Sequence, residues 1–515
     1  MIPMKRIVFL LSLIFFASPA NLAAVDFNLI SQKLKNNIRK VTLDNGLRLV
    51  MMQYGKSPTA SLYIKFRVGA VDEAPEEAGT AHLLEHMLFK GTENVGTRNY
   101  EKEKKYLDQI EVYGRRLDEM NLAAREYQLS GAPVPPGLAS DIEKTSKRLD
   151  SLHAMHREFV VKSEDSWIYD QNGQTGFNAY TNQDVTNYQI QLPVNRMEVW
   201  AKLESDRLKK PVLREFYTER DVVREERRMR VDNVGTSLLR EKFLDAAFGE
   251  HPYRKPVIGY ESVIPFLDLK ETENFFYNHY TPDNMVIAIV GQIDFDKTEK
   301  LIKRYFASIK RKSDRKPVRR FEKFNTGYKK TVFRHPSGAV VLMGWKKPGL
   351  GHPDNIPFDL LGHIMSDGPT SRLYKRLVIQ EKLALSVSAW NGDPGERYNN
   401  LFTVYVKLAS GASHARVEEI VNEEFEKVKS GDLKKTEIDS VKKRIFADFF
   451  HGIDSTSTLA DVLSYYELLT GKWETLFELY DKMTSLDKKD VEKAAAVYIN
   501  NENLVVGNLE TTVNR

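Results

Sequence analysis

The sequence predicts an α+β protein made of two similar repeats in one chain, and two observations lead to this prediction. In each half an apolar strand leads through a turn into a helical segment, and the segment HLLEH at 82–86 aligns with DLLGH at 359–363. In each half a Tyr and an Asn also precede a short apolar run, at 285–291 and at 504–507, of the kind that forms a buried strand. We therefore expect two repeats, each combining a sheet with helices.

The first half is longer than the second, and the excess predicts an inserted helical hairpin. The interval from the start of the HLLEH segment to the closing Asn is 202 residues, against 144 for its counterpart, so the first half carries about 58 more. Apolar residues between 106 and 127 recur in alternating steps of four and three, and a Pro/Gly-rich breaker follows at 130–137. We expect two antiparallel helices within about 100–163, which serve either as a solvated strut or as an arm for a substrate or partner.

The N-terminus predicts export from the cytoplasm. Lys5 and Arg6 precede an apolar run at 7–17 and a small-residue stretch that ends at Ala24, which is the pattern of a secretory signal. The run is shorter than the roughly 20 residues that a membrane-spanning helix needs, and no later segment is long and apolar enough to span. We expect a signal peptide at 1–24 and a periplasmic or secreted protein, with an uncleaved membrane anchor as the alternative.

The rest of the chain divides into three parts. We expect the first repeat at 25–309, a basic, proline-containing linker at 310–325, and the second repeat at 326–515. A charge run of this kind is usually a solvated linker, and an anionic docking site is the alternative.

The composition excludes several kinds of site and partner. The 515 residues include no Cys, so disulfides, Cys-ligated zinc, iron–sulfur clusters and Cys nucleophiles are all excluded. The 76 basic and 71 acidic residues give a formal charge of +5, a surplus too small and too dispersed to indicate a nucleic-acid partner. Any metal ion must therefore be bound by His, Asp or Glu.

His82, Glu85 and His86 give the strongest chemical signal in the sequence. They lie in a segment at 81–89 that predicts a helix, on which the two histidines share one face. Two imidazoles spaced by four residues can bind one zinc ion, and a nearby carboxylate can accept a proton from the attacking water. The order H-x-x-E-H inverts the common zinc-protease motif and is itself a hydrolase signature. Two solvated histidines on an amphipathic helix are the alternative.

The third ligand that a catalytic zinc ion requires is expected on a charged helix at 218–229. Glu219 and Glu226 are seven residues apart and share a face of this helix, so one could bind the metal while the other supports it. The spacing alone does not choose between Glu225 and Glu226.

Three longer segments carry the distinctive residues: HLLEHMLFKGT at 82–92, FNAYTNQDVTNYQIQLP at 177–193 and ERDVVREERRMRVDN at 219–233. Together they resemble the pitrilysin/insulinase family of zinc metallopeptidases, especially its half-size members, which are similar to mitochondrial processing peptidase and bacterial homologues. The resemblance implies two α/β-roll repeats of the LuxS/processing-peptidase-like kind. It also implies one Zn²⁺ per chain, with His82, His86 and Glu226 as ligands, Glu85 as general base and Glu219 as a supporting carboxylate.

The resemblance also implies where a peptide substrate binds. Family members bind the substrate as an added β-strand, and the matching edge here consists of Phe177, Asn178, Ala179, Tyr180 and Thr181. Backbone hydrogen bonds along such an edge give affinity with little sequence preference, so we expect extended or unfolded peptides as substrates. An ordinary sheet edge is the alternative.

One departure from the family lies in the second repeat. Family members usually carry an Arg, and a Tyr seven residues later, which hold the substrate and polarise its carbonyl; Val378 and Leu385 occupy the matching positions here. Some half-size members pair a zinc-bearing subunit with a separate subunit that supplies the Arg/Tyr function. We therefore expect this chain to be the zinc subunit of a heterodimer, with a homodimer as the alternative.

Three functions follow from these patterns. The first is a zinc endopeptidase acting on extended peptides, and the second is a non-catalytic assembly or scaffold subunit of the same family. The third is a binding protein that uses the helical hairpin and holds zinc structurally. The intact H-x-x-E-H motif favours the first, whereas the missing Arg/Tyr pair favours the second.

Overall fold

A computed structural model describes residues 27–313, 318 and 322–512. The expected signal peptide at 1–24 and part of the expected linker at 310–325 lie outside the described residues. Among the residues described, no helix has both the length and the apolar character required to cross a membrane.

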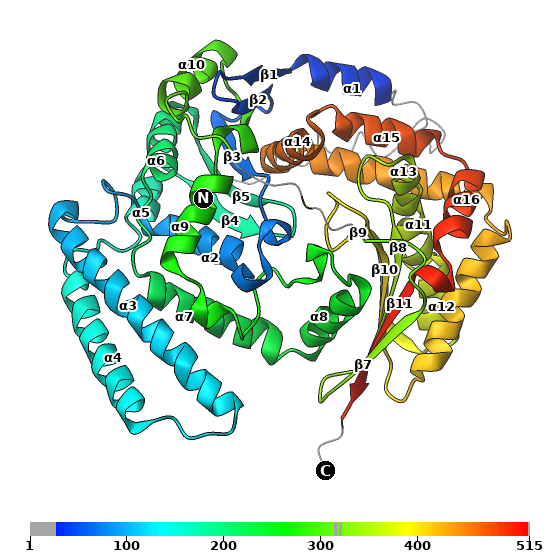
Figure 1. The fold of residues 1–515 in the computed structure, drawn as a ribbon. Helices are drawn as coiled ribbons and strands as arrows, with labels where there is room; N and C mark the ends of the chain where they lie inside the picture. Colours follow the sequence, from blue (N-terminus) through cyan, green and yellow to red (C-terminus); the bar gives the residue numbers. More distant parts are fainter. Residues whose placement is uncertain (1–26, 314–317, 319–321, 513–515) are drawn as a thin grey trace, which may run out of the picture.

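Two mixed sheets form the framework of the molecule (Figure 1), and they share one strand topology except that the first has an additional edge strand, β1. The first contains β1 (Ile38–Thr42), β2 (Arg48–Gln53), β3 (Thr59–Phe66), β4 (Thr175–Thr181), β5 (Thr186–Pro193) and β6 (Met285–Gly291). The second contains β7 (Lys329–His335), β8 (Val340–Lys347), β9 (Ala384–Asp393), β10 (Asn400–Leu408) and β11 (Leu504–Thr511). The spatial orders are β1-β2-β6-β3-β5-β4 and β7-β11-β8-β10-β9. In each sheet one parallel pair, β2 with β6 or β7 with β11, continues into three antiparallel pairings, which confirms the predicted two-repeat α+β fold.

The matching Tyr/Asn segments close the two repeats in the same way. Asn284 and Asn503 each end a short 3₁₀ turn directly before a buried strand. The side-chain amide of Asn284 donates to the carbonyl of His279, and that of Asn503 donates to the carbonyl of Tyr498. The amide thus fixes the turn that leads into β6 or β11, and this explains why the sequence pattern recurs.

Apart from the two helices of the inserted hairpin, the helices cover the two sheets. In the first repeat they are α1 (Phe27–Asn36), α2 (Thr80–Met87), α5 (Glu164–Gln171), α6 (Met197–Lys209), α7 (Phe216–Arg227), α8 (Gly235–Ala247), α9 (Leu269–His279) and α10 (Phe295–Phe306). In the second repeat they are α11 (Pro357–Ser366), α12 (His414–Lys429), α13 (Lys435–Ile453), α14 (Thr456–Thr470), α15 (Thr475–Ser485) and α16 (Lys488–Tyr498).

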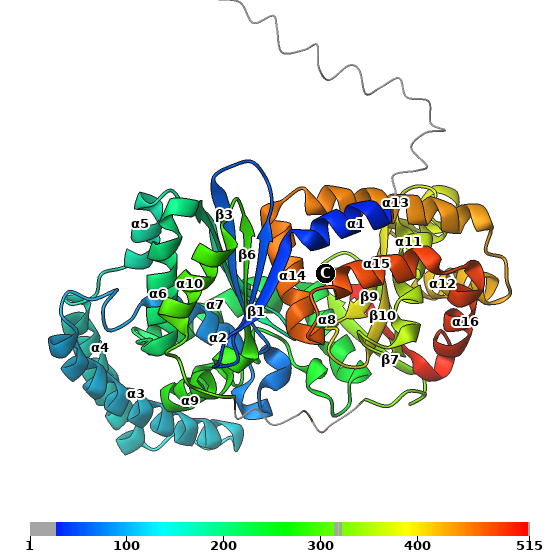
Figure 2. The same cartoon turned by 90° about the horizontal axis from the view of Figure 1, so that it is seen from above.

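Each repeat places a helix on the sheet of the other. One face of the first sheet packs on helices of its own repeat, including α2, α6 and α10, whereas the opposite face packs on α14 and α15 of the second repeat (Figure 2). In return, α8 of the first repeat packs on the second sheet. The two repeats are therefore joined through shared hydrophobic cores.

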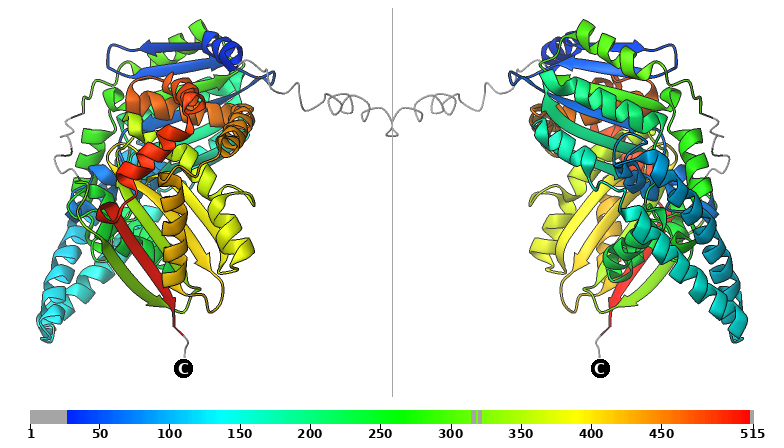
Figure 3. Two further views of the ribbon diagram at one scale, coloured as in Figure 1. Left: turned by 90° about the vertical axis from the view of Figure 1, so that its right-hand side faces the viewer. Right: turned by 90° about the vertical axis from the view of Figure 1, so that its left-hand side faces the viewer.

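The inserted hairpin consists of α3 (Tyr100–Leu129) and α4 (Pro136–Arg157), which lie antiparallel and extend from the body of the molecule (Figure 3). Its base is fixed by the buried Glu103, which lies 2.8 Å from His156 Nε2 and accepts a hydrogen bond of 2.7 Å from Arg214 Nε. Burial alone would raise the pKa of Glu103, but hydrogen bonds from His156, Arg214 and Thr97 lower it to about 2. The hairpin is thus attached through a buried ionic contact at its root.

Candidate functional site

Helix α2 directs the H-x-x-E-H side chains away from the hydrophobic core. Leu83, Leu84 and Met87 are buried in the core of the first repeat. His82, Glu85 and His86 therefore lie on the other side of the helix, where they are only partly buried. The rings of the two histidines are 4.8 Å apart.

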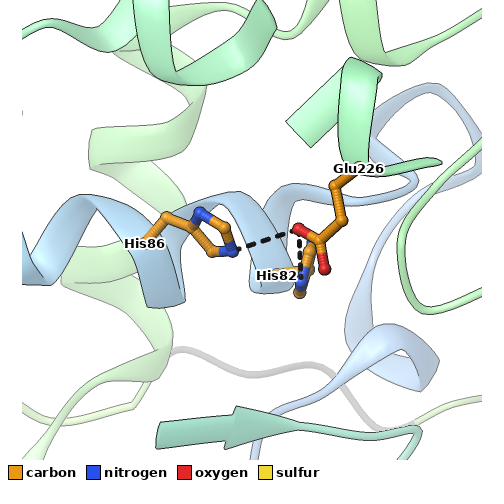
Figure 4. A group of neighbouring side chains, drawn as sticks. All are labelled: His82, His86 and Glu226. Atoms are coloured by element: carbon orange, nitrogen blue, oxygen red, sulfur yellow. Dashed lines mark ion pairs between the residues drawn. The ribbon is translucent and has the colours of Figure 1, made fainter. Parts of the chain in front are cut away.

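His82, His86 and Glu226 converge on one point (Figure 4). Glu226, near the end of α7, places its Oε2 3.5 Å from His86 Nε2 and 3.8 Å from His82 Nε2. The three candidate ligand atoms lie within 4.8 Å of one another. Tetrahedral zinc with bonds of about 2.0–2.2 Å separates its ligands by roughly 3.3–3.6 Å. The two distances from Glu226 to the imidazoles, 3.5 and 3.8 Å, are close to this range, and one carboxylate with two imidazoles is a donor set that suits zinc. Across the described ranges, no other group of three or more such side chains is suited to hold a metal.

The neighbouring Glu225 points elsewhere. It is exposed, and its carboxylate accepts hydrogen bonds of 2.5 and 2.9 Å from Arg228. Glu226 instead faces the histidines, and its Oε1 lies 2.6 Å from Arg230 Nη1. Of the two glutamates that the spacing left open, Glu226 therefore faces the histidines and Glu225 faces Arg228 at the surface.

The two histidines differ in their electrostatic environment. Burial, together with the charges of His86 and Arg230, lowers the pKa of His82 to about 3. The ring of His82 is thus neutral at physiological pH, which is the form that binds a metal ion. Burial also disfavours the charged form of His86, but the hydrogen bond and charge of Glu219 outweigh it and raise the pKa of His86.

Glu219 contacts the ring nitrogen of His86 that faces away from Glu226, and Lys90 in turn contacts Glu219. Glu219 Oε1 lies 3.0 Å from His86 Nδ1, and its Oε2 lies 2.5 Å from Lys90 Nζ. Burial would raise the pKa of Glu219, but the hydrogen bonds from His86 and Lys90 lower it to about 2, so the carboxylate stays ionised. Such a contact fixes the ring orientation of a metal-binding histidine. The sequence prediction did not include Lys90, because its partner Glu219 is distant in the sequence and no local pattern connects the two.

Glu85 lies at the junction of helix α2 and strand β4. Thr181, the last residue of β4, donates a hydrogen bond of 2.5 Å to Glu85 Oε2. Burial raises the pKa of Glu85, and the Thr181 hydrogen bond only partly opposes this effect. A carboxylate with a raised pKa, held in one orientation, is suited to accept and return a proton.

Among the strands that the structure describes, β4 is the edge of the first sheet and pairs on one side only, with β5. Phe177 packs edge-on against Phe89, with ring centroids 5.2 Å apart, and Ala179 contacts the same core. Asn178 is exposed, and Tyr180 donates a hydrogen bond of 2.8 Å to Asp461 of α14. The five residues expected to bind substrate thus form one edge strand, whose C-terminal residue contacts Glu85.

A cavity of about 450 Å³ adjoins Glu85 and His86. Its walls include Phe89, Asn178 and the segment 160–165, through which the chain returns from the inserted hairpin to α5. The cavity provides room for a side chain beside the carboxylate of Glu85.

The positions that differ from the family pattern lie in the second repeat. Val378 packs against the core of that repeat, and Leu385 is 60% exposed on β9. The nearby Arg372 and Arg376 are bound to Glu437 and Glu381, at 2.8 and 3.0 Å. Neither Val378 nor Leu385 can hold a carbonyl oxygen.

Two family models match the chain. The model described as "Insulinase (Peptidase family M16)" matches residues 49–111, which contain the H-x-x-E-H helix. The model described as "Peptidase M16 inactive domain" matches residues 267–445, most of which belong to the second repeat.

Similar proteins include several named zinc proteases. "Zinc protease PqqE" of Helicobacter pylori is 25% identical over 468 residues, which cover 89% of each chain. "Uncharacterized zinc protease YmxG" of Bacillus subtilis is 22% identical over 460 residues, covering 89% of this chain and 95% of that protein.

Solved structures of similar fold cover nearly the whole chain. A protease from Helicobacter pylori superposes with a TM-score of 0.75 at 23% identity, covering 92% of this chain and 99% of that one. A peptidase M16 inactive domain from Pseudomonas fluorescens superposes with a TM-score of 0.72 at 15% identity, covering 93% and 99%.

Proposed function

Because the chain belongs to the insulinase (M16) family of peptidases, we propose that it is a zinc-dependent endopeptidase that cleaves extended or unfolded peptides. The observation that carries the proposal is the convergence of His82, His86 and Glu226 beside Glu85, at the end of a free edge strand. The donor set is complete within one repeat, and the proton-transferring carboxylate is already oriented.

The residues divide the chemistry among them. Zinc held by His82, His86 and Glu226 would supply Lewis-acid polarisation of the scissile carbonyl and a more acidic water. Glu85 takes the proton of the attacking water and passes it to the leaving amine, while Thr181 holds its carboxylate in place. The backbone of β4 binds the peptide as an added strand, and this mode requires an extended substrate.

Two further proposals concern partner and location. Since Val378 and Leu385 replace the Arg/Tyr pair, we propose that a second family subunit supplies that function in a heterodimer, with a homodimer as the alternative. We also propose that residues 1–24 direct export and that the mature chain works in the periplasm or outside the cell. A similar structure, the first half of the protease PqqL from Escherichia coli, is described as periplasmic, and this supports the location.

A non-catalytic assembly subunit is the second candidate, and the apolar residues Val378 and Leu385 favour it. Hydrolysis of a quenched fluorescent peptide by the zinc-loaded mature chain, alone and mixed with a family subunit that carries the Arg/Tyr pair, separates the two functions. We expect cleavage in the mixture and little or none by the chain alone. Full activity of the isolated chain would contradict the heterodimer, and absence of cleavage in every combination would establish the assembly subunit instead.

A further inference from the structure

Three segments meet beside the candidate site, and one of them belongs to the second repeat. They are residues 69–73, which precede helix α2; the turn 182–185, which follows strand β4; and the loop 394–399, which joins β9 to β10. The first two segments are hydrogen-bonded to each other, since the amides of residues 70 and 71 donate to the carbonyls of residues 182 and 183.

Arg397 in this loop contacts both of the other segments. Its guanidinium donates two hydrogen bonds, of 2.7 and 3.0 Å, to the carboxylate of Asp72, and a third, of 3.2 Å, to the carbonyl of Asp184. The side chains of Arg397 and Asp72 are 1% and 2% exposed, so the pair is shielded from water. A paired, two-point contact of this kind is directional and strong in a buried setting.

The carboxylate of Asp184 provides the second attachment. It accepts hydrogen bonds from the backbone amides of Glu396 and Arg397, at 2.5 and 3.2 Å, and from the hydroxyl of Tyr253 at 2.6 Å. Gly395 approaches so closely that a Cβ there would lie 2.7 Å from Asp184 Oδ2. The loop is thus held by its backbone as well as by Arg397.

Asp72 and Asp184, the two residues that bind the loop, are each close in sequence to residues of the candidate site. Asp72 precedes Glu73, whose buried carboxylate accepts hydrogen bonds from Gly79 and Ala81 at the start of helix α2. Asp184 follows Thr181 by three residues, and Thr181 donates to Glu85. The loop therefore binds the start of the metal-binding helix and the end of the edge strand at the same time.

We propose that loop 394–399 of the second repeat aligns helix α2 with strand β4, and that Arg397 is the positioning residue through which it acts. This inference rests on the proposed peptidase function, which assigns the roles of the residues that the loop aligns. The second repeat, which lacks the H-x-x-E-H motif, would then help to position the residues of the site in the first repeat. Loss of the guanidinium would remove both hydrogen bonds through which the loop holds the buried carboxylate of Asp72, so segment 69–73 would be held less firmly.

Hydrogen exchange and zinc affinity of the full mature chain test this proposal, with Arg397→Gln as the variant and Arg48→Gln as the matched control. Arg48 on β2 also makes an ionic contact across the repeats: its Nη1 lies 3.6 Å from the carboxylate of Glu467 on α14 and donates a hydrogen bond of 2.8 Å to the carbonyl of the same residue. Strand β2 pairs with β1 and β6, so Arg48 controls for loss of an ionic contact between the repeats away from loop 394–399. Zinc affinity is measured by competition with a chelator.

In Arg397→Gln we expect amide exchange in 79–87 and 175–185 to be faster by about tenfold or more, with other segments much less affected. We expect zinc affinity to fall about 10–100-fold, as for loss of other supporting contacts, and Arg48→Gln to change neither quantity. If Arg397→Gln does not fold, Arg397→Lys, which keeps the charge but loses the two-point geometry, is measured by the same criteria.

Exchange in these two segments that stays at the wild-type rate, or rises no more than in the rest of the chain, would overturn the proposal. An equal effect of Arg48→Gln would also overturn it, because any ionic contact between the repeats would then suffice. Hydrogen exchange requires neither zinc nor cleavage, so it tests the alignment separately from the proposed peptidase function.

Discussion

Replacement of Glu85 by Gln should reduce peptide hydrolysis by about 10²–10⁴-fold, the contribution typical of a positioned general base, without loss of zinc. Gln has nearly the same shape and can still accept the hydrogen bond from Thr181, but it cannot take up a proton. Glu85 is also not one of the converging ligand atoms, so the metal site stays complete. The measurement is the steady-state rate with a quenched peptide, together with the zinc content of the same preparation.

Glu76→Gln is the control for this substitution. Glu76 is an exposed glutamate in the segment that leads to helix α2, so its change alters the local charge without touching the site. Its rate should equal that of the wild type. A Glu85→Gln variant that keeps wild-type hydrolysis would show that another group transfers the proton, and loss of zinc from it would show that Glu85 acts as a ligand.

Removal of any one of the three converging side chains should abolish stoichiometric zinc binding. His82→Ala and Glu226→Gln each leave two ligands where a catalytic site needs three. The loss of affinity should exceed the roughly 10–100-fold that follows removal of a supporting residue. We expect the purified wild type to hold one zinc ion per chain, measured by metal analysis after dialysis, and each variant to hold almost none.

Glu225→Gln is the matched control, one residue away on the same helix. Its carboxylate is exposed and bound to Arg228, so its removal should leave one zinc ion per chain. Zinc lost from Glu225→Gln but retained in Glu226→Gln would reverse the assignment that the geometry gives.

Features that depend on nearby residues could be predicted from the sequence. The apolar run at 285–291 coincides with β6, and the shared Tyr/Asn segments form equivalent turns. The alternation of steps of three and four shows why α3 is a helix, and the histidines share a face because four residues make about one turn.

Features that depend on the approach of distant segments could not be predicted in this way. Glu225 and Glu226 are both on α7, and only the packing of α7 against α2 shows which of them faces the histidines. Arg397 lies 325 residues from its partner Asp72, so no local pattern connects them. The hydrogen bond from Thr181 to Glu85 likewise requires the sheet edge and the helix to be in place.

The dependence of hydrolysis on zinc occupancy is the decisive test of whether His82, His86 and Glu226 form the metal site of a zinc peptidase. The mature chain, with its partner subunit if cleavage needs one, is stripped of metal by a chelator and then titrated with Zn²⁺ while peptide cleavage is followed. We predict no cleavage in the stripped protein and a linear rise that ends at one zinc ion per chain, absent when the chain carries His82→Ala. Cleavage that persists without zinc, or that returns equally in the His82→Ala chain, would show that zinc bound at this site is not required for hydrolysis.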